Sequence, residues 1–501
     1  MADAALPMGE PTSVQSEAVG PAPPTASRAG IATKFFYGFG SIAFGVKDNG
    51  FQTILLLFYN QVVGLPAAMV GAAILLALAV DAVMDPIVGQ ISDNLRTPWG
   101  RRHPFMYASA LPLGLSYLLL WNPPHASQGV QFVYLVVVAI IVRTFISFYE
   151  APSSALAPEL TTDYRERTSL LGYRVFFAWF GGLSMSFLAF TVLLRPDETH
   201  PVGQLNPAGY AHYGMVAGAV MAVTILISAL GTHSRIKTFT VPPQRRIGLG
   251  GIIKEMGASL SNRSFVMLLL SSLFSSTATG LAFSMNLYFY TYLWALSAGQ
   301  ISVFAVASLV AAALATALAA AMSGRDKRRS AIVLFIAGMG LASAPQILRL
   351  LGWFPVNGSP VLFPLLLAFN TVGLSPMIAA SILGSSMIAD VVEDSQVRTG
   401  RRSEGLFFAV NSFVQKAVSG LGIFMSSAIL TLVHFPAKAG AGGGAPVDPA
   451  IVRNLALIYL PVMMGLYLIS MAWLSGYRIT RQTHEANLEQ LARAKEAGAG
   501  D

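Results

Sequence analysis

The 501-residue sequence contains no cysteine. Disulfide bonds and thiolate metal sites are therefore excluded, and cysteine usage does not indicate a redox compartment. Charged residues are also scarce: they make up 11% of the chain, whereas 54% of it is hydrophobic and the mean hydropathy is +0.60. Soluble globular domains have about 25% charged residues. The sequence therefore predicts a polytopic integral membrane protein that contacts the lipid bilayer.

Two patterns that other functions need are also missing. No phosphate-binding loop of the form G-x-x-x-x-G-K-[ST] occurs, which argues against ATP-driven transport by this chain. All seven histidines fall in loops, in tails or near the ends of apolar segments, so no histidine proton relay is expected in the membrane core. With no histidine metal motif and no nucleophile constellation, we expect neither an enzyme nor a cofactor.

The few charges that are present are mostly basic. A net charge of +8 would suggest a nucleic-acid partner for a soluble protein, but here the basic residues cluster in alternate short loops, so no nucleic-acid partner is expected. By the positive-inside rule these loops and both termini are cytoplasmic, which predicts a multi-pass protein of the plasma (inner) membrane. The basic loops contain Arg96, Arg101 and Arg102; Arg165 and Arg167; Arg235, Lys237, Arg245, Arg246 and Lys254; Arg325, Lys327, Arg328 and Arg329; and Arg398, Arg401 and Arg402.

Twelve apolar runs are long enough to span a bilayer. They cover roughly residues 34–63, 66–92, 104–122, 130–154, 168–194, 209–232, 264–295, 299–323, 330–353, 360–390, 405–433 and 451–477. Whether Pro152, Pro345 and Pro376 end a span or kink a helix is left open. The longest basic loop divides the spans six and six, which predicts a disordered cytoplasmic tail (1–33), a six-helix bundle (34–234), a cytoplasmic linker (235–263), a second six-helix bundle (264–478) and a cytoplasmic tail (479–501).

A loose internal repeat supports this division. Pro158 and Glu159 correspond to Ala389 and Asp390, and in both halves acids and arginines follow, and then a Phe-Phe-Ala triplet. Many secondary transporters consist of two such halves with the substrate site between them.

Two acids lie where the sequence otherwise calls for hydrocarbon. Asp81 and Asp85 follow the apolar run 67–80 and are four residues apart, so both lie on one face of a helix. An ionisable group inside a membrane span is costly unless it faces protein, water or an ion. Na⁺ or a proton would relieve the repulsion of the pair, which makes it a candidate site for a coupling ion, and a metal site if the ion is Na⁺. The alternative is structural: the pair links helices through basic loop residues.

Several motifs resemble those of a known family. Gly89, Asp93, Gly100, Arg101 and Arg102 resemble the loop motif of the major facilitator superfamily. A longer pattern over about residues 34–480 resembles the glycoside-pentoside-hexuronide:cation symporters of that superfamily, the family of melibiose permease. It comprises Tyr37, Gly38, Phe39 and Gly40; Val62, Val63, Gly64 and Leu65; Asp81, Asp85 and Pro86; Trp99 and Gly100; Pro158, Asp163, Arg165, Glu166 and Arg167; and Met387, Ala389, Asp390 and Val391. The resemblance implies an all-α membrane protein with the major facilitator fold, in which twelve transmembrane helices form two pseudo-symmetric six-helix halves.

The resemblance also implies roles for individual residues. Asp81, Asp85 and the Ser147 hydroxyl would form the cation site. Lys416 would lie near the coupling carboxylates, or alternatively extend to a membrane surface as a snorkelling side chain. Glu150 matches a sugar-binding aspartate. The cytoplasmic gate, whose members pair and separate during alternating access, would comprise Asp93, Arg101, Arg102, Asp390, Glu393, Arg402 and Glu404.

Other substrate contacts of the family are not kept. Gly45 stands where the family has a sugar-binding aspartate, and Asp48 follows one turn later on roughly the same face. Val175 aligns with the family's sugar-binding arginine, and Arg174 precedes it. We therefore expect a rebuilt substrate pocket between Asp48, Glu150, Arg174 and Lys416, with Tyr149, Asn411 and Ser412 as further candidates.

These observations predict a monomeric symporter that moves a small organic solute, a sugar or glycoside, together with Na⁺ or H⁺ by alternating access. Because Tyr173 and Arg174 are similar to a pair in the vertebrate lysophospholipid symporters of the same superfamily, an amphipathic solute is an alternative. An alternative from another class is a receptor or scaffold that kept the fold and lost transport. The costly charges of Asp81, Asp85 and Lys416 argue against it.

Overall fold

The computed structural model describes residues 30–161, 163–238, 260, 262–399, 404–438 and 447–497. Over these residues every regular element is a helix, as the composition predicts. Nearly all of the expected tail 1–33 and most of the expected linker 235–263 lie outside the described residues.

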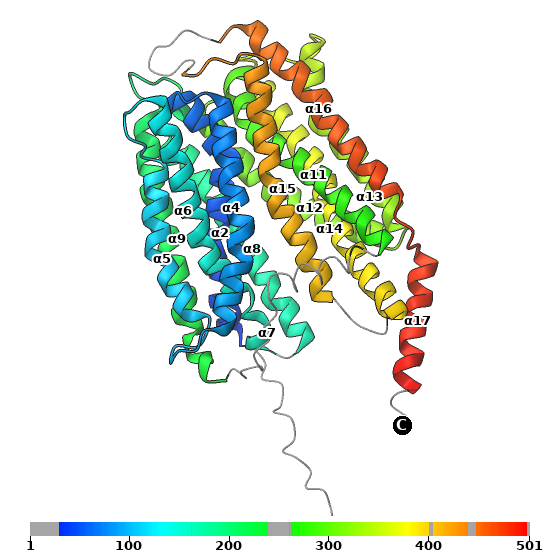
Figure 1. Ribbon diagram of the computed structural model, residues 1–501. Helices are drawn as coiled ribbons and strands as arrows, with labels where there is room; N and C mark the ends of the chain where they lie inside the picture. The colour runs from blue at the N-terminus through cyan, green and yellow to red at the C-terminus, as the bar shows by residue number, and fades with distance from the viewer. Residues whose placement is uncertain are drawn as a thin grey trace, which may run out of the picture.

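The first half of the chain forms the group of helices coloured blue to green on the left of Figure 1. Its elements are α1 (Ile31–Phe39), α2 (Ser41–Asn49), η1 (Gly50–Ile54), α3 (Leu55–Leu57), η2 (Phe58–Val63), α4 (Ala67–Asn94), α5 (His103–Leu120), α6 (Gln128–Ser154), α7 (Ala157–Leu160), α8 (Tyr164–Leu188), η3 (Ala189–Leu193), η4 (Gly203–Leu205), α9 (Pro207–His233) and η5 (Ser234–Thr238).

The second half, green to red in Figure 1, lies beside the first and ends in a helix that leaves the bundle. Its elements are α11 (Arg263–Tyr288), η6 (Phe289–Leu293), α12 (Ala298–Ser323), α13 (Lys327–Leu350), α14 (Leu362–Thr399), α15 (Glu404–Leu432), α16 (Pro449–Ser475) and α17 (Arg481–Ala497).

Nine helices in the described part of the chain are long and apolar enough to cross a membrane. The three other expected spans are helical as well. Range 34–63 is divided among α1, α2, α3 and the π-helical turns η1 and η2, range 104–122 is the shorter α5, and range 405–433 is α15. Pro152, Pro345 and Pro376 lie inside α6, α13 and α14, so none of them ends a span.

Side-chain caps fix where several of these helices begin. The Asp326 carboxylate accepts a hydrogen bond from the backbone N–H of Arg329 at the start of α13, and Asp448 caps α16 in the same way. Ser297 and Gln300 form a reciprocal capping box at the start of α12. Such caps satisfy backbone N–H groups that a helix start leaves without a partner.

Glycines allow α2 and α8 to approach closely. A Cβ atom added at Gly45 would collide with the backbone carbonyl oxygen of Ala178, and one added at Gly182 would press against the backbone of Gly45. The position where the resembling family has an aspartate is therefore closed by helix packing in this chain.

The two halves meet where α4 packs against α15, where α8 and η3 pack against α12, and where η1 and α3 pack against α11. Their helices lie close together at the upper end of Figure 1 and diverge toward the lower end, where α17 and the C-terminus lie. We call the lower end, with Lys34, Arg101, Glu159, Asp390 and α17, the terminal end. The upper end, with Gln61, Gln204, Tyr292 and Pro436, is the opposite end.

Candidate ion and substrate site

Asp81 on α4 contacts two side chains of α6. The Arg143 Nη1 donates to Oδ2 of Asp81 at 2.8 Å, and the Ser147 Oγ donates to Oδ1 at 3.0 Å. All three residues are buried. Arg143 and Ser147 are four residues apart and therefore share the face of α6 that packs on α4. The structure thus brings Asp81 and Ser147 together, and both oxygens of the Asp81 carboxylate are already engaged by protein.

Sequence reasoning missed Arg143. It lies in the apolar run 130–154, so the cost argument that singles out Asp81 applies equally to it. Its guanidinium carbon lies 4.9 Å from the centroid of the Phe51 ring, which is a cation–π contact. Arg143 is therefore held between an aromatic face of η1 and the Asp81 carboxylate.

Asp85 lies one turn beyond Asp81 on α4 and is partly exposed, whereas Asp81 is only 9% exposed. The two acids therefore have different environments, although they share a helix face. Asp81 belongs to a buried contact between α4 and α6, and Asp85 lies where the helix becomes more accessible.

Arg174 on α8 reaches back to α6. Its Nη1 donates to the Ser153 hydroxyl at 2.8 Å, and its Nη2 donates to the backbone carbonyl of Glu150 at 3.4 Å. The structure therefore brings Arg174 and Glu150 together. Tyr149 is fully buried beside them on α6 and donates to the Ser228 hydroxyl of α9 at 3.4 Å, so it also ties α6 to α9.

Asp48 pairs with neighbours on its own helical segment. Its Oδ2 accepts from the Gln52 amide at 2.6 Å, and its Oδ1 lies 3.5 Å from the Lys47 ammonium. Lys47 is buried, with its ammonium 4.6 Å from the Phe44 ring centroid, and sequence reasoning missed it although it precedes Asp48 in the same apolar range. The Asp48 side chain is 38% exposed and can accept further hydrogen bonds.

The expected contribution of α15 is described only in part. Asn411 is buried. The side chains of Ser412, Lys416 and Glu404 lie outside the described part of the structure, and so does the whole of Arg402. Their expected roles therefore stay predictions.

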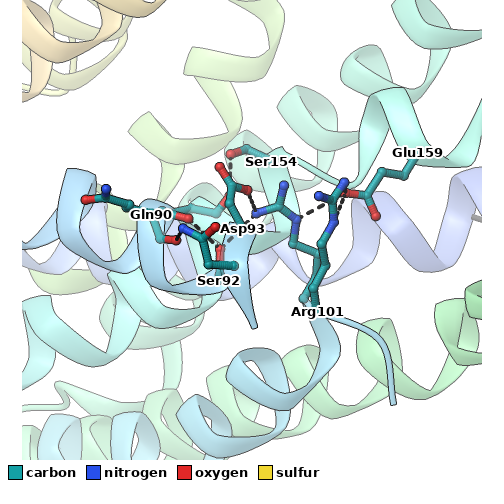
Figure 2. A network of polar contacts seen from close by, with 10 residues as sticks. Gln90, Ser92, Asp93, Arg101, Ser154 and Glu159 are labelled. Atoms are coloured by element: carbon teal, nitrogen blue, oxygen red, sulfur yellow. Dashed lines mark hydrogen bonds and ion pairs between the residues drawn. The ribbon is translucent and has the colours of Figure 1, made fainter. Parts of the chain in front are cut away.

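A cluster of ion pairs lies at the terminal end of the first half (Figure 2). The Arg101 Nε and Nη2 donate to Oε1 of Glu159 at 3.0 and 2.6 Å, and the Arg102 Nε donates to the same oxygen at 3.2 Å. Arg102 also pairs with Asp93 and donates to the Ser92 hydroxyl at 2.8 Å. The acid that joins both arginines, Glu159, was noticed in the repeat but was not among the expected gate residues.

The second half has its own cluster at the same end. The Lys327 ammonium lies 2.7 and 2.8 Å from the two carboxylate oxygens of Asp390. His484 of α17 places its Nδ1 3.0 Å from Oε2 of Glu393 and 3.6 Å from Oδ1 of Asp390. The C-terminal helix thus contacts the expected gate residues of α14, which sequence reasoning did not foresee.

These two clusters are related by the internal repeat. Glu159 and Asp390 occupy corresponding positions in the repeat. Glu159 binds Arg101, which lies just before α5, and Asp390 binds Lys327, the first residue of α13. Each of these ion pairs joins residues of the same half. Those expected gate residues that the structure describes therefore make ion pairs within their own half in this conformation.

At the opposite end, hydrogen bonds cross between the halves. The Tyr292 hydroxyl donates to the Gln61 Oε1 at 2.8 Å, and the Gln61 Nε2 donates to the backbone carbonyl of Pro436 at 3.0 Å. Gln204 donates to the Thr291 hydroxyl at 3.2 Å and to the carbonyl of Leu296 at 3.1 Å. Hydrogen bonds therefore join the two halves at the opposite end, while their helices diverge at the terminal end.

Comparisons with known proteins agree with this architecture. Residues 36–481 match the model of the family described as MFS/sugar transport protein. The chain is 26% identical to the uncharacterized symporter sll1374 of Synechocystis sp. (93% of this chain, 97% of that protein), and 26% identical to the putative glycoside/cation symporter YagG of Escherichia coli (93% and 95%). Its fold is similar to the crystal structure of the nucleoside transporter NupG, with a TM-score of 0.58 at 12% identity over 90% of this chain and 100% of that one.

The family match covers most of the chain, and the fold likeness extends over both halves. The prediction of a membrane transport protein with the major facilitator fold is confirmed, and so is the expectation that the chain is a transporter and not an enzyme. The chain belongs to the MFS/sugar transport protein family of the major facilitator superfamily.

Proposed function

We propose that this protein is a cation-coupled symporter that moves a sugar or glycoside across the bacterial inner membrane by alternating access. The relatives carry symporter names, and one of them is named as a putative glycoside/cation symporter. The observation that carries the proposal is the buried contact of Asp81 with Arg143 and Ser147 inside apolar helices. A charge placed at membrane depth is costly and is the usual mark of an ion pathway.

The proposed ion site is the acid pair Asp81 and Asp85, with Ser147 as a hydroxyl neighbour and Lys416 as the cation contributed by α15. Binding one positive ion here changes the charge balance between α4 and α6. Because α4 also packs against α15 of the other half, such a change acts at a contact between the halves. This is how ion occupancy is coupled to conformation.

The proposed substrate site lies alongside, with Asp48, Glu150 and Arg174 contributed by three different helices. Sugar hydroxyls donate hydrogen bonds to carboxylates, and the partly exposed Asp48 carboxylate has the capacity to accept them. Tyr149, Lys416, Asn411 and Ser412 complete the proposed set.

The proposed transport cycle moves two halves, residues 34–234 and 264–478, against each other. The hydrogen bonds of Gln61 and Gln204 to the second half must break to open the opposite end. The gate residues of the terminal end must then exchange partners within a half for partners across the halves. With both termini cytoplasmic and the protein acting as a monomer, the present conformation faces the cytoplasm.

Transport in proteoliposomes tests the proposal. The purified protein is reconstituted and offered radiolabelled D-xylose, lactose, methyl β-D-xyloside and a lysophosphatidylcholine, each with an imposed inward H⁺ or Na⁺ gradient. We expect ion-driven accumulation of at least one of the sugars. Accumulation of the lysolipid alone would favour the amphipathic alternative. Binding of a probe without any transport would favour the receptor or scaffold.

The proposed orientation has its own test, because the chain has no cysteine. A cysteine introduced by Ser127→Cys should react with an impermeant maleimide from outside intact cells. A cysteine introduced by Ser323→Cys should react only after the membrane is permeabilised. Both positions are exposed in the structure. Labelling of both from the same side would contradict the topology.

A further inference from the structure

The Asp81 carboxylate is already paired with a positively charged side chain, that of Arg143. The Arg143 guanidinium donates to one carboxylate oxygen at 2.8 Å and the Ser147 hydroxyl donates to the other at 3.0 Å. Arg143 is 5% exposed and Asp81 is 9% exposed, so bulk water screens neither charge effectively. The Phe51 ring packs against the guanidinium and holds it in place.

We propose that Arg143 is a built-in counter-ion of Asp81 that keeps Na⁺ off this carboxylate, and that the coupling ion of this transporter is therefore the proton. This inference rests on the proposed symport function and names its ion. Arg143 is a specificity-determining residue in this account, because its charge decides which cation can reach the acid.

The exclusion of Na⁺ follows from charge and coordination. An arginine side chain stays protonated at every physiological pH, so its positive charge cannot be withdrawn to admit a second cation. Na⁺ needs several oxygen ligands, and the two Asp81 oxygens are occupied by Nη1 and by a hydroxyl. To bind Na⁺ here, the ion would have to displace the Arg143 Nη1 from Oδ2 and would then stand beside a second fixed positive charge in a low-dielectric interior.

A proton places smaller demands on the site. It passes from water to one carboxylate oxygen of Asp81, which becomes a neutral acid, and no coordination shell is required. The pair then changes from zero net charge to +1, carried by Arg143, which can still donate a hydrogen bond to the carbonyl oxygen of the neutral acid, so the attraction between α4 and α6 is weakened and neither side chain is displaced. The Ser147 hydroxyl can remain hydrogen-bonded to the neutral acid.

Other charged groups near this contact belong to the same electrostatic balance. Asp85 lies one turn away on α4, and Glu150 lies two turns from Arg143 on the helix that packs against α4. On α15, the other long helix packed on α4, the charged residues are Glu404 and Lys416, whose side chains lie outside the described part, and α2, which contacts α6, carries Lys47 and Asp48. Asp85 gives Arg143 a second acid on the same helix face.

Direct Na⁺ binding to the purified full-length protein tests the inference. The unfolding temperature is measured in detergent with increasing NaCl, with choline chloride keeping the ionic strength constant. For the wild type we expect no Na⁺-specific shift. For Arg143→Gln, which removes the charge and offers an amide oxygen, we expect a saturable rise of about 2–4 °C with Na⁺, because a ligand bound only to the folded state stabilises it.

Two further variants serve as controls. Arg349→Gln removes an arginine at the opposite end, where its guanidinium bonds to the Pro355 carbonyl and to Asn357, and should behave as the wild type. Asp81→Asn combined with Arg143→Gln should lose the Na⁺ response that Arg143→Gln alone shows. A saturable, Na⁺-specific shift in the wild type that Asp81→Asn removes would overturn the inference, and this arm decides even if Arg143→Gln does not fold.

The proteoliposome assay separates this inference from the proposed function. Uptake driven by an inward H⁺ gradient and unchanged by Na⁺ is expected. Uptake driven by Na⁺ would overturn the role of Arg143 and leave symport intact. Failure to transport any probe would count against symport, whereas the Na⁺-binding measurement would still decide the role of Arg143.

Discussion

The two halves of this transporter share a fold but differ in what lies at membrane depth. In the first half, charged side chains meet inside the bundle: Lys47 with Asp48, Arg143 with Asp81, and Arg174 with the backbone of α6. In the described part of the second half, hydroxyl groups make the corresponding contacts, such as Ser271 with Ser470 at 2.9 Å and Thr279 with Tyr467 at 3.1 Å.

This difference suggests different roles for the charged contacts of the first half and the hydroxyl contacts of the second. Ion pairs in a low-dielectric interior respond strongly when one charge is neutralised, whereas hydroxyl pairs between helices contribute little and carry no charge to switch. We infer that the first half holds the ion-sensitive contacts and that the second half supplies a rigid partner. In the proposed site, Lys416 on α15 is the charge that the second half contributes.

The largest effect is expected from breaking the buried pair. Asp81→Leu leaves the Arg143 guanidinium without its carboxylate and should cost about 3–5 kcal/mol of unfolding free energy. Asp81→Leu together with Arg143→Leu should recover most of that loss, because no buried charge then remains. Unfolding in mixed detergent micelles measures both.

Ser284→Ala in the second half, which removes a buried hydroxyl contact with Ser426, is the matched control and should cost far less. If the double variant is as unstable as Asp81→Leu alone, the pair is not the origin of the cost, and the contrast between the halves fails.

An intermediate effect is expected at the terminal end, where the described residues of both halves form ion pairs. Glu159→Gln removes the acid that binds Arg101, and Asp390→Asn removes the acid that binds Lys327. Each change should slow turnover about tenfold, equivalent to about 1.4 kcal/mol, and leave substrate affinity within about twofold. Initial uptake rates and equilibrium binding of the same sugar measure the two quantities. If only one of the two variants transports more slowly, the corresponding acids of the repeat do not form a common gate.

A smaller effect is expected from the hydroxyl pairs of the second half. Ser271→Ala removes the hydrogen bond to Ser470 and should cost about 0.6 kcal/mol of stability, the average for such contacts in membranes. The dependence of transport on the ion gradient should stay unchanged. A changed ion dependence would mean that the second half also holds ion-sensitive contacts.

The smallest effect concerns Asp197, in the loop between η3 and α9. Hydrogen bonds from Thr199 and His200 lower the pKa of its carboxyl from 3.8 to about 2. Because the folded pKa lies below the unfolded one, the carboxylate stabilises the loop above pH 4 and loses this effect as the pH falls toward 2.

Hydrogen exchange of residues 195–206 should therefore quicken between pH 4 and pH 2, after correction for the intrinsic exchange rate. Asp197→Asn should show no such step. A step of equal size in that variant would assign the change to another group.

Much of the fold could be predicted from the sequence, because long apolar runs fold as helices wherever they lie. The twelve expected ranges are all helical, and capping residues such as Asp326 and Asp448 stand where helices begin. The breaks in the first span could not be foreseen, since π-helical turns follow from packing and leave no simple period. Likewise, the α17 contact with Glu393 depends on tertiary structure that a polar tail does not reveal.

The site could be predicted in part. Asp81 was found because it is an acid inside an apolar run, and Ser147 because the family resemblance marks it; the structure places the Asp81 Oδ1 and the Ser147 Oγ 3.0 Å apart. Arg143 was within reach of the same cost argument but belongs to no matched motif. Lys327 could not be singled out from its basic loop, because only the fold shows which of its cations reaches Asp390.

The most direct test of the central claim compares the wild type with Asp81→Asn, using a sugar that the reconstituted wild type accumulates. The substitution keeps the shape of the side chain and removes the charge that Arg143 balances. The account predicts that Asp81→Asn still binds the sugar but that its ion-driven accumulation is at least about tenfold lower than that of the wild type. Accumulation equal to that of the wild type would contradict the account and place ion coupling elsewhere in the molecule.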